Sequence, residues 1–294
     1  MKKQTVKILI WGNDYNSRFV FKNLLKLYSH IDMIDISDIF IFKLKAILKC
    51  NVIYVISGKM GLFLILAKFI KKRIIFHWVG TDVIKFNKLS KFRKFIYLLV
   101  INKHIFVSKN LQNELELKTN KAVIFPIIDL NTKLDIKNSI DKKILTYIPQ
   151  GREDFFYGSI IVSTIIDLKT FKLNVIGNNG EYLKKSNNIK YWGWIDDKKV
   201  SDLINACSIY IRFTKHDGIP KLVINNLYAG NAVIYNHKFL YTYYCDISKK
   251  KLINSIKEIY QIHILQINKQ VLFIKNMYID KYTYKKLLGV LFEK

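Results

Sequence analysis

The sequence predicts an α/β protein with two doubly wound, Rossmann-like domains, and three observations support this prediction. The chain has 294 residues, which is long for one hydrophobic core and comfortable for two. Short apolar runs that favour β-strands alternate with longer segments of helical period, as is typical of parallel sheets covered by helices. This pattern stops in a polar stretch and then begins again, so we expect two such sheets in series.

In the first half of the chain, apolar runs and helical periods follow one another closely. The predicted strands are Val6–Trp11, Ile31–Ile36, Val52–Ser57, Arg73–Trp78, His104–Ser108 and Ala122–Ile127. The predicted helices are Ser17–Ser29, Met60–Lys71, Leu89–Ile101 and Lys109–Lys118. Because the strands are apolar along their whole length rather than at alternate positions, we expect helices on both faces of this sheet.

The second half begins after Asp129–Lys142, a polar stretch without a clear period that we interpret as the linker. The predicted strands are Ile144–Ile148, Leu173–Gly177, Ile189–Trp192, Ser208–Phe213 and Ala232–Tyr235. The predicted helices are Gly158–Leu168, Asp197–Cys207 and Lys221–Tyr228, and the tail from Ser248 should be mostly helical. We therefore expect an N-terminal domain at residues 1–128, a C-terminal domain at 129–275 and a terminal segment at 276–294.

The chain is strongly basic, with 49 Lys and Arg against 22 Asp and Glu and a formal net charge of +27. Such a charge attracts nucleic acid, an anionic membrane face or phosphorylated substrates, although the abundance of Ile, Lys and Asn is also typical of AT-rich genomes. A nucleic-acid-binding protein is one alternative. However, no RRM, KH, zinc or helix-turn-helix signature occurs and the basic residues are spread along the chain, so no nucleic-acid partner is expected.

The cysteine pattern and the apolar runs bear on the compartment. Cys50, Cys207 and Cys245 are widely spaced and form no CxxC pair, which favours a reducing compartment. No signal peptide opens the chain, so a hinged solute-binding protein is disfavoured. The longest apolar run, Met60–Ile70, is interrupted by Lys68 and is too short to span a bilayer. We expect a cytoplasmic protein that is soluble or peripheral on the cytoplasmic membrane face.

Two segments after first-half strands could carry chemistry. Gly12 and Asn13 follow the first strand, where a glycine permits close approach of a ligand to the next helix; because GxGxxG is absent, a plain turn is the alternative. His77, Trp78 and Asp82 crowd the end of a later strand and offer a titratable group, a flat surface for a sugar ring and a hydroxyl acceptor. A capped turn is the alternative there.

Two further segments follow strands of the second half. Arg152 comes just after a strand, and its planar guanidinium group suits phosphate oxygens. An ion pair of Arg152 with Glu153 or Asp154 is equally consistent with the sequence. A polar loop with Asp217 and Gly218 leads to a Pro220 that suits the first turn of a helix. The start of this helix offers free amides and a positive dipole end, which together can hold a diphosphate.

This last segment resembles the donor domain of the GT4-like branch of retaining GT-B glycosyltransferases. Asp217-Gly218-Ile219-Pro220 is similar to the E-G-x-P element of that family, and Ala229-Gly230-Asn231-Ala232-Val233-Ile234 is similar to its A-x-G-x-P-V-I ending. The segments 77–82 and 151–155 also resemble parts of a bacterial and archaeal subset. The resemblance covers residues 6–235. It implies two Rossmann-like domains that face a central cleft, with a C-terminal helix at Tyr282–Phe292 that crosses back to the N-terminal domain.

The resemblance also implies an enzyme. It would move a sugar from a UDP-, GDP- or other nucleoside-diphosphate sugar to a lipid-linked, polysaccharide or protein-glycan acceptor, with retention and without a metal or other cofactor. The N-terminal domain would bind the acceptor, and the C-terminal domain would bind the donor.

The family's functional positions carry over to this chain as follows. Asp217 would lie near the donor sugar, with Gly218 in the same loop. Ile219 and Pro220 would present backbone amides to the sugar, and Asn225 would bind the ribose. Arg152 would contact the diphosphate. His77 or Asp82 would line the acceptor side, near Gly12, Asn13 and Trp78.

Two departures from the family pattern weaken this assignment. Both family Glu residues are replaced, one by Asp217 and the other by Asn225, which lacks a charge. The basic residue that often follows the Arg152 position is missing, and Lys215 or Arg212 could substitute for it. The chain could therefore be an altered enzyme or, as the alternative, a catalytically degenerate relative that acts as a binding or partner subunit.

Two basic, aromatic segments, Met60–Arg73 and Lys85–Val100, suggest that the acceptor is presented at an anionic membrane surface. Residues 1–125 hold 23 basic and 7 acidic residues, so most of the excess positive charge lies in this region. The alternative is that both helices pack their apolar faces on the sheet and leave only their lysines in water.

Overall fold

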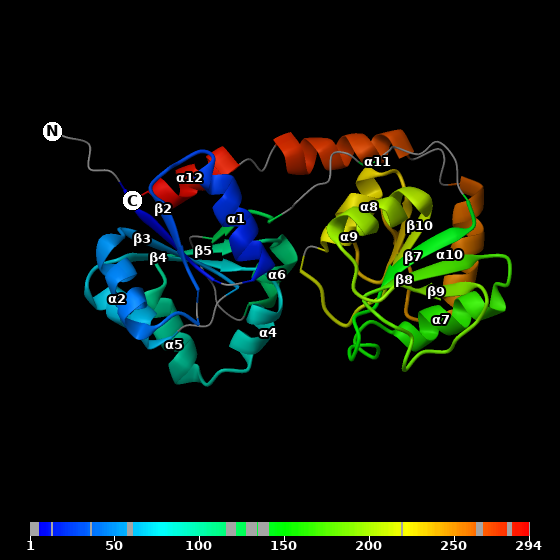
Figure 1. Cartoon of the computed structure of the whole chain (residues 1–294), viewed down its shortest axis with the longest axis horizontal. Helices are drawn as coiled ribbons and strands as arrows, with labels where there is room; N and C mark the ends of the chain where they lie inside the picture. Colours follow the sequence, from blue (N-terminus) through cyan, green and yellow to red (C-terminus); the bar gives the residue numbers. More distant parts are fainter. Residues whose placement is uncertain are drawn as a thin grey trace. The chain divides into compact units, whose positions relative to one another are not determined.

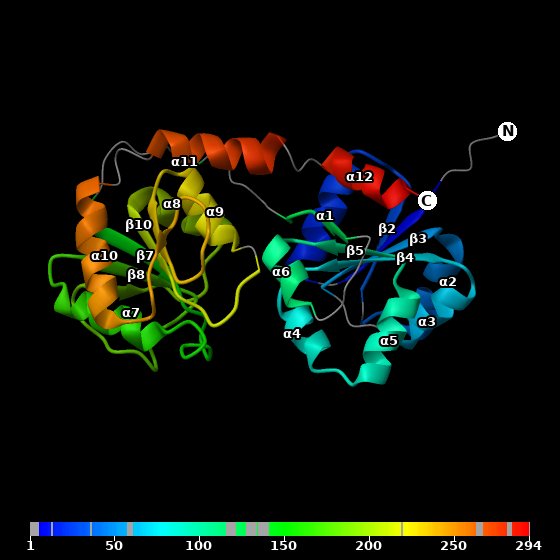
Figure 2. The same ribbon diagram turned by 180° about the vertical axis from the view of Figure 1, so that it is seen from behind.

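The computed structural model describes residues 6–12, 14–35, 37–57, 61–115, 122–127, 134, 141–218, 220–262, 267–280 and 284–293. The chain forms two units, shown in Figure 1 and from behind in Figure 2. The first contains Met1–Asp129, Asp217–Ile219 and Lys281–Lys294, and the second contains Leu130–His216 and Pro220–Asp280. The linker expected at 129–142 lies almost entirely outside the described residues.

The first unit is built on a parallel sheet with the strand order β2-β1-β3-β4-β5-β6. Its strands are β1 (Ile8–Trp11), β2 (Ile31–Ile34), β3 (Val52–Ile56), β4 (Arg73–Trp78), β5 (Lys103–Phe106) and β6 (Ala122–Ile124). Ile8 of β1 is aligned with Ile31 of β2 on one side and with Val52 of β3 on the other. The strand order therefore reverses between β1 and β3, which makes this position the topological switch point.

Helices cover both faces of this sheet. They are α1 (Tyr15–Leu25), α2 (Phe40–Lys49), α3 (Leu62–Phe69), α4 (Thr81–Asn87), α5 (Lys91–Val100), α6 (Lys109–Glu114) and α12 (Tyr284–Phe292). Helices α2 to α6 share a core with strand residues such as Leu9 and Phe76. Helices α1 and α12 share the opposite core with Ile8 and Tyr54. Because neighbouring residues of each strand point to opposite faces, the continuous apolar runs supply both cores.

The second unit is also built on a parallel sheet, but with a different strand order, β12-β11-β10-β7-β8-β9. Its strands are β7 (Lys143–Tyr147), β8 (Lys172–Ile176), β9 (Ile189–Tyr191), β10 (Ile209–Arg212), β11 (Ala232–Tyr235) and β12 (Tyr243–Tyr244). Ile144 of β7 is aligned with Leu173 of β8 and with Ile209 of β10. The switch point of this sheet lies between β7 and β10.

The helices of the second unit are α7 (Gly158–Asp167), α8 (Asp197–Ala206), α9 (Lys221–Tyr228), α10 (Lys249–Ile262) and α11 (Ile267–Ile274), followed by the π-helical η2 (Lys275–Asp280). Helices α7 and α10 share one core with β7, β8 and β10. Helix α11 packs on α9, where the buried Gln270 donates to the carbonyls of Leu227 (2.7 Å) and Asn231 (3.1 Å). These bonds tie α11 to the last turn of α9 and to the residue that precedes β11.

Each predicted strand and helix is present with ends that differ by a few residues, although residues 36, 60, 116–118 and 282–283 of the predicted elements lie outside the described residues. Helices α2 and α4 and the short strand β12 are additional. Helix α2 cannot be recognised from its periodicity, because Ile47 is its buried residue whereas Phe40, Ile41 and Phe42 are exposed. Among the helices that the structure describes, none combines the length and apolar character that crossing a bilayer requires.

Helix α12 is attached to the first unit by its apolar face and by a hydrogen bond. Leu291 is fully buried, and its carbonyl accepts a hydrogen bond from Arg73 Nη1 at 3.0 Å. Tyr284 makes an edge contact with Phe19 of α1, with ring centroids 6.1 Å apart.

We predict that Leu291→Ala lowers the free energy of unfolding by about 2–5 kcal/mol, because it leaves a cavity in a closed core. The exposed Leu272 of α11 is the matched control, and Leu272→Ala should cost less than about 0.5 kcal/mol. Urea unfolding of both variants measures the difference. Equal small losses would contradict the docking of α12 on this core.

Candidate functional site

The loops after β7 and β10 lie side by side at the switch point of the second sheet. The amide of Lys215, after β10, donates to the carbonyl of Phe155, after β7, at 3.0 Å. Ligands of doubly wound sheets bind at the carboxyl ends of the strands where the strand order reverses. The predicted donor residues Arg152 and Lys215 lie in these two neighbouring loops, and both side chains are exposed.

A tight turn presents Arg152 at this edge. The amide of Arg152 donates to the carbonyl of Pro149 at 3.0 Å, and Gly151 has a φ of +75°. This geometry is that of a type II turn, which needs a glycine at its third position because a side chain disfavours positive φ. The sequence Pro149-Gln150-Gly151-Arg152 therefore fixes the direction in which the chain leaves β7.

Glu153 stabilises the same turn instead of pairing with Arg152. Its Oε1 accepts hydrogen bonds from Asn178 Nδ2 (2.6 Å) and from the amide of Gly151 (3.0 Å). Burial alone would raise the pKa of Glu153, but hydrogen bonds from its own amide, Asn178 and Gly151 hold that pKa below its usual value. Within the described residues, the Arg152 guanidinium forms neither an ion pair nor a hydrogen bond, so its donors face solvent.

A second arginine, Arg212 of the neighbouring strand β10, lies among aromatic side chains. The guanidinium carbon of Arg212 lies 5.2 Å from the ring centroid of Phe156 and 6.0 Å from that of Tyr147. Burial raises the pKa of Tyr147, whereas the positive charges of Arg212 and Arg152 oppose this rise. Both positive charges therefore act on the Tyr147 phenol, and we call Arg152, after β7, and Arg212, at the end of β10, the cationic cluster.

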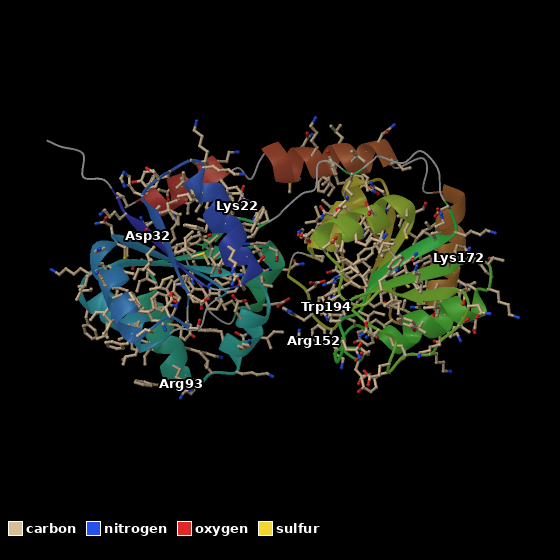
Figure 3. All side chains as sticks on the ribbon, in the orientation of Figure 1. Lys22, Asp32, Arg93, Arg152, Lys172 and Trp194 are labelled. Atoms are coloured by element: carbon tan, nitrogen blue, oxygen red, sulfur yellow. The ribbon has the colours of Figure 1, made fainter. Side chains whose placement is uncertain are left out.

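Trp194 is a candidate residue that the sequence did not reveal. Its side chain is 69% exposed, and its ring lies edge-on to Tyr147 with centroids 6.2 Å apart. Figure 3 labels Trp194 and Arg152 at the same end of the second unit. The available signal was the run Tyr191-Trp192-Gly193-Trp194, where a glycine after an edge strand leaves an aromatic ring in a short loop.

Helix α9 follows β10 in the sequence and begins nine residues after Arg212. Pro220 precedes it with φ −78° and ψ 107°, and the Ile224 amide donates to the Pro220 carbonyl at 3.2 Å. The expectation that Pro220 presents an amide is corrected, because proline has no N–H. The amides of Leu222 and Val223 have no acceptor within the helix and are donors at this positive dipole end.

The other residues expected around the donor lie in different settings. Ile219 lies outside the described residues. Asn225 is buried within α9. Asp217 and Gly218 are grouped with the first unit, where a Cβ atom on Gly218 would lie 2.5 Å from the carbonyl oxygen of Val79. Only a residue without a side chain fits at position 218.

The expected residues after β1 form a packed turn. A Cβ atom on Gly12 would lie 2.0 Å from Ser17 Oγ, so the glycine lets α1 approach the end of β1. Asp14 begins α1 by accepting the Ser17 amide at 2.8 Å. This arrangement favours the plain turn that was the alternative for Gly12. Asn13 lies outside the described residues.

His77 and Trp78 are core residues of the first unit. Both side chains are buried, and both ring nitrogens of His77 are engaged, Nδ1 with the Tyr54 hydroxyl (2.6 Å) and Nε2 with the Phe125 carbonyl (2.8 Å). Trp78 Nε1 donates to His104 Nδ1 at 3.0 Å. The interpretation of His77 as a catalytic group and of Trp78 as a sugar platform is corrected, because neither ring reaches the surface.

Asp82 organises the turn between β4 and α4. Its carboxylate accepts the amides of Gly80 (2.7 Å), Val79 (3.0 Å) and Val83 (3.0 Å). Burial raises the pKa of Asp82, and these hydrogen bonds partly offset the rise. The geometry matches the capped turn that was the alternative to a catalytic role. In the part of the chain that is described, no cluster of three or more His, Cys, Asp or Glu could hold a metal ion.

Together, these features define a class of fold. The described residues form two parallel, doubly wound sheets, each flanked by helices, and this is the GT-B-type architecture predicted from the sequence. No known family's sequence profile matches the chain, and no curated protein matches it by sequence.

Solved structures do match the fold. HepE of Anabaena in complex with UDP and glucose has a TM-score of 0.71 and 9% identity, covering 97% of this chain and 99% of that one. Sucrose-phosphate synthase from Thermosynechococcus elongatus has a TM-score of 0.63 and 10% identity, covering 97% and 95%. The UDP-GlcNAc 2-epimerase from Neisseria meningitidis, bound to UDP-GlcNAc, has a TM-score of 0.61 and 10% identity, covering 99% and 100%. At such identities the likeness confirms the fold class and leaves the chemistry to the site.

We predict an acid sensitivity that depends on His77. Burial lowers the pKa of His77 to about 3, so the folded state keeps the ring neutral while the unfolded chain takes up a proton below its ordinary pKa of 6.5. The stabilisation is complete above pH 6.5 and is lost as the pH falls towards 3, by up to about 1.4 kcal/mol per pH unit.

Urea unfolding at pH 7.5, 6.5 and 5.5 measures this effect. His77→Gln should lose less stability on acidification than the wild type, whereas the exposed-site control His30→Gln should follow the wild type. The same pH dependence in all three proteins would refute the assignment.

Proposed function

We propose that the chain is a glycosyltransferase that takes its sugar from a nucleoside-diphosphate sugar bound by the second unit. The observation that carries this proposal is the cationic cluster of Arg152 and Arg212 at the switch point of the second sheet. Two planar guanidinium groups match the oxygens of a diphosphate, and the amides at the start of α9 favour the same negative charge. The exposed ring of Trp194 suits a flat nucleobase.

Each residue then has a distinct part in donor binding. Arg152 and Lys215 bind the diphosphate from two neighbouring loops. Arg212 supplies the second positive charge, in place of the basic residue that often follows the Arg152 position in the family and that this chain lacks. The family resemblance assigns Asn225 to the ribose and Asp217 to the donor sugar, and we keep both roles as part of the proposal. Support for these two residues comes from the sequence pattern alone.

The reaction would be sugar transfer between two oxygens. The bond between the anomeric carbon and the β-phosphate oxygen breaks, the acceptor hydroxyl oxygen bonds to that carbon, and the hydroxyl proton is released. Negative charge grows on the departing diphosphate, where Arg152, Lys215 and the α9 amides stabilise it more strongly than in the ground state. Retention of configuration and independence from a metal follow from the family resemblance and belong to this proposal.

The choice of donor and acceptor rests on indirect support. The HepE structure contains UDP and glucose, and the Neisseria meningitidis epimerase is bound to UDP-GlcNAc, so UDP-sugars are the first donors to test. The acceptor would be a glycan or a lipid-linked sugar. A cytoplasmic location, inferred from the cysteine pattern, stays a prediction.

A donor-binding relative without transferase activity is the second candidate. Both family carboxylates are replaced, by Asp217 and by the uncharged Asn225, which favours weakened or lost catalysis. Donor binding is common to both candidates, and transfer separates them.

We predict that Arg152→Ala weakens UDP binding by roughly 10–100-fold, because charge-assisted hydrogen bonds to the diphosphate are lost. Isothermal titration calorimetry measures this change. Lys184→Ala removes an exposed positive charge elsewhere on the second unit and should leave the affinity unchanged. Equal affinities of the Arg152→Ala variant and the wild type would contradict the proposed site.

We also predict that Asp217→Ala lowers acceptor-dependent UDP release from a UDP-sugar by about 10²-fold or more while UDP affinity changes little. A coupled assay with a panel of donors and acceptors measures release. UDP binding without release from any pair would support the binding-only relative. Acceptor-independent conversion of UDP-GlcNAc to its 2-epimer, followed by NMR, would contradict sugar transfer.

A further inference from the structure

Three helices on one face of the first sheet carry apolar side chains outwards as well as inwards. Ile47 of α2, Leu64 of α3 and Val100 of α5 are buried against the sheet. On the opposite side, Phe69 of α3 is 79% exposed and Phe92 of α5 is 72% exposed. An ordinary surface helix has polar residues on its outer side. These helices carry apolar residues on both sides, and this needs another explanation.

Helix α2 shows this pattern most strongly. Phe40, Ile41 and Phe42, in its first turn, and Leu48, near its end, are exposed, whereas Ile47 packs inwards. Single exposed apolar residues are common on soluble proteins, but adjacent ones on neighbouring elements mark an interaction surface.

The three helices form one continuous surface. Helix α3 packs against both α2 and α5, and the rings of Phe40 and Phe63, with centroids 4.9 Å apart, join α2 to α3. Figure 1 and Figure 2 show α2 and α5 on the same side of the first sheet. We call the outer sides of Phe40–Lys49, Leu62–Phe69 and Lys91–Val100 the α2–α3–α5 face.

The charge of this face selects its partner. Helix α2 holds three lysines, α3 holds one, and α5 holds two lysines and an arginine, whereas none of the three helices contains Asp or Glu. Two copies of the face would repel each other because all their charges are positive. Nucleic acid offers phosphates for the lysines but no apolar layer for exposed residues such as Ile41, Leu62 and Phe69.

We propose that the α2–α3–α5 face docks on an anionic lipid bilayer. The exposed Phe, Leu and Ile side chains enter the boundary between headgroups and acyl chains, and the lysines contact the lipid phosphates around them. This inference goes beyond sugar transfer and does not depend on it, because binding to lipid needs neither donor nor acceptor.

Cosedimentation of the full chain with vesicles tests the proposal. The wild type should pellet with phosphatidylglycerol vesicles at low salt, less at high salt, and least with pure phosphatidylcholine. The triple variant Phe69→Ser, Phe92→Ser and Phe95→Ser should bind phosphatidylglycerol at least roughly tenfold more weakly. The matched control is Leu240→Ser with Leu272→Ser, two exposed apolar residues of the second unit, and it should bind like the wild type.

A charge-reversal pair separates the electrostatic part of the interaction. Lys43→Glu with Lys45→Glu on α2 should weaken binding to phosphatidylglycerol at least roughly tenfold at low salt. Lys184→Glu with Lys185→Glu makes the same change in net charge on the second unit and should have a smaller effect. Equal effects of the two pairs would overturn the location of the docking surface.

A fluorescence measurement does not rely on loss of binding. Cys50, Cys207 and Cys245 are buried, so a single introduced cysteine can be labelled selectively in the folded protein. An environment-sensitive dye on Phe69→Cys should shift to shorter wavelength with phosphatidylglycerol vesicles, whereas the same dye on Leu240→Cys should not shift.

Three further results would overturn the proposal. The first is no pelleting of the wild type with phosphatidylglycerol at low salt. The second is equal binding by the triple variant and its control, with both folded by circular dichroism. The third is concentration-dependent self-association that the triple variant abolishes while vesicles are not bound, which would assign the face to a second copy of the chain.

Discussion

The site in the second unit depends on the reversal of strand order between β7 and β10. This reversal leaves the carboxyl ends of two adjacent strands without a helix between them, and the bond from the Lys215 amide to the Phe155 carbonyl joins the two loops. The positive φ of Gly151 then directs Arg152 outwards, while Glu153 is occupied by Asn178 and the Gly151 amide. Because the adjacent Glu153 carboxylate is already hydrogen-bonded, the guanidinium of Arg152 stays available for an anionic ligand.

The first unit also has a parallel sheet covered by helices, but its polar residues at the end of β4 have structural roles. Three residues near the end of β4 bond to other parts of the protein. The ring of His77 bonds to a tyrosine hydroxyl and a backbone carbonyl, and the Trp78 ring nitrogen donates to a second histidine. The carboxylate of Asp82 accepts backbone amides. These bonds stabilise the core and the turn after β4. What distinguishes this unit is its outer surface, where α2, α3 and α5 expose apolar side chains among lysines.

The fold was largely predictable from the sequence because buried parallel strands leave continuous apolar runs. Helix α2 could not be predicted from its hydrophobic pattern, because the exposed apolar residues Phe40, Ile41 and Phe42 hide the helical period. The site was predictable only in part. A position at a strand end identifies Arg152 as a candidate, but it does not reveal whether a ring such as that of His77 points into the core. Trp194 was missed because its exposure depends on how the loop after β9 leaves the sheet.

Hydrogen–deuterium exchange with and without a nucleoside diphosphate tests the central claim most directly, namely that the switch point of the second sheet is an anion site. The account predicts slower exchange on ligand addition in peptides covering residues 150–156 and the first turn of α9, with little change in the helices of the first unit. Protection confined to other segments, or no change at saturating ligand, would contradict it.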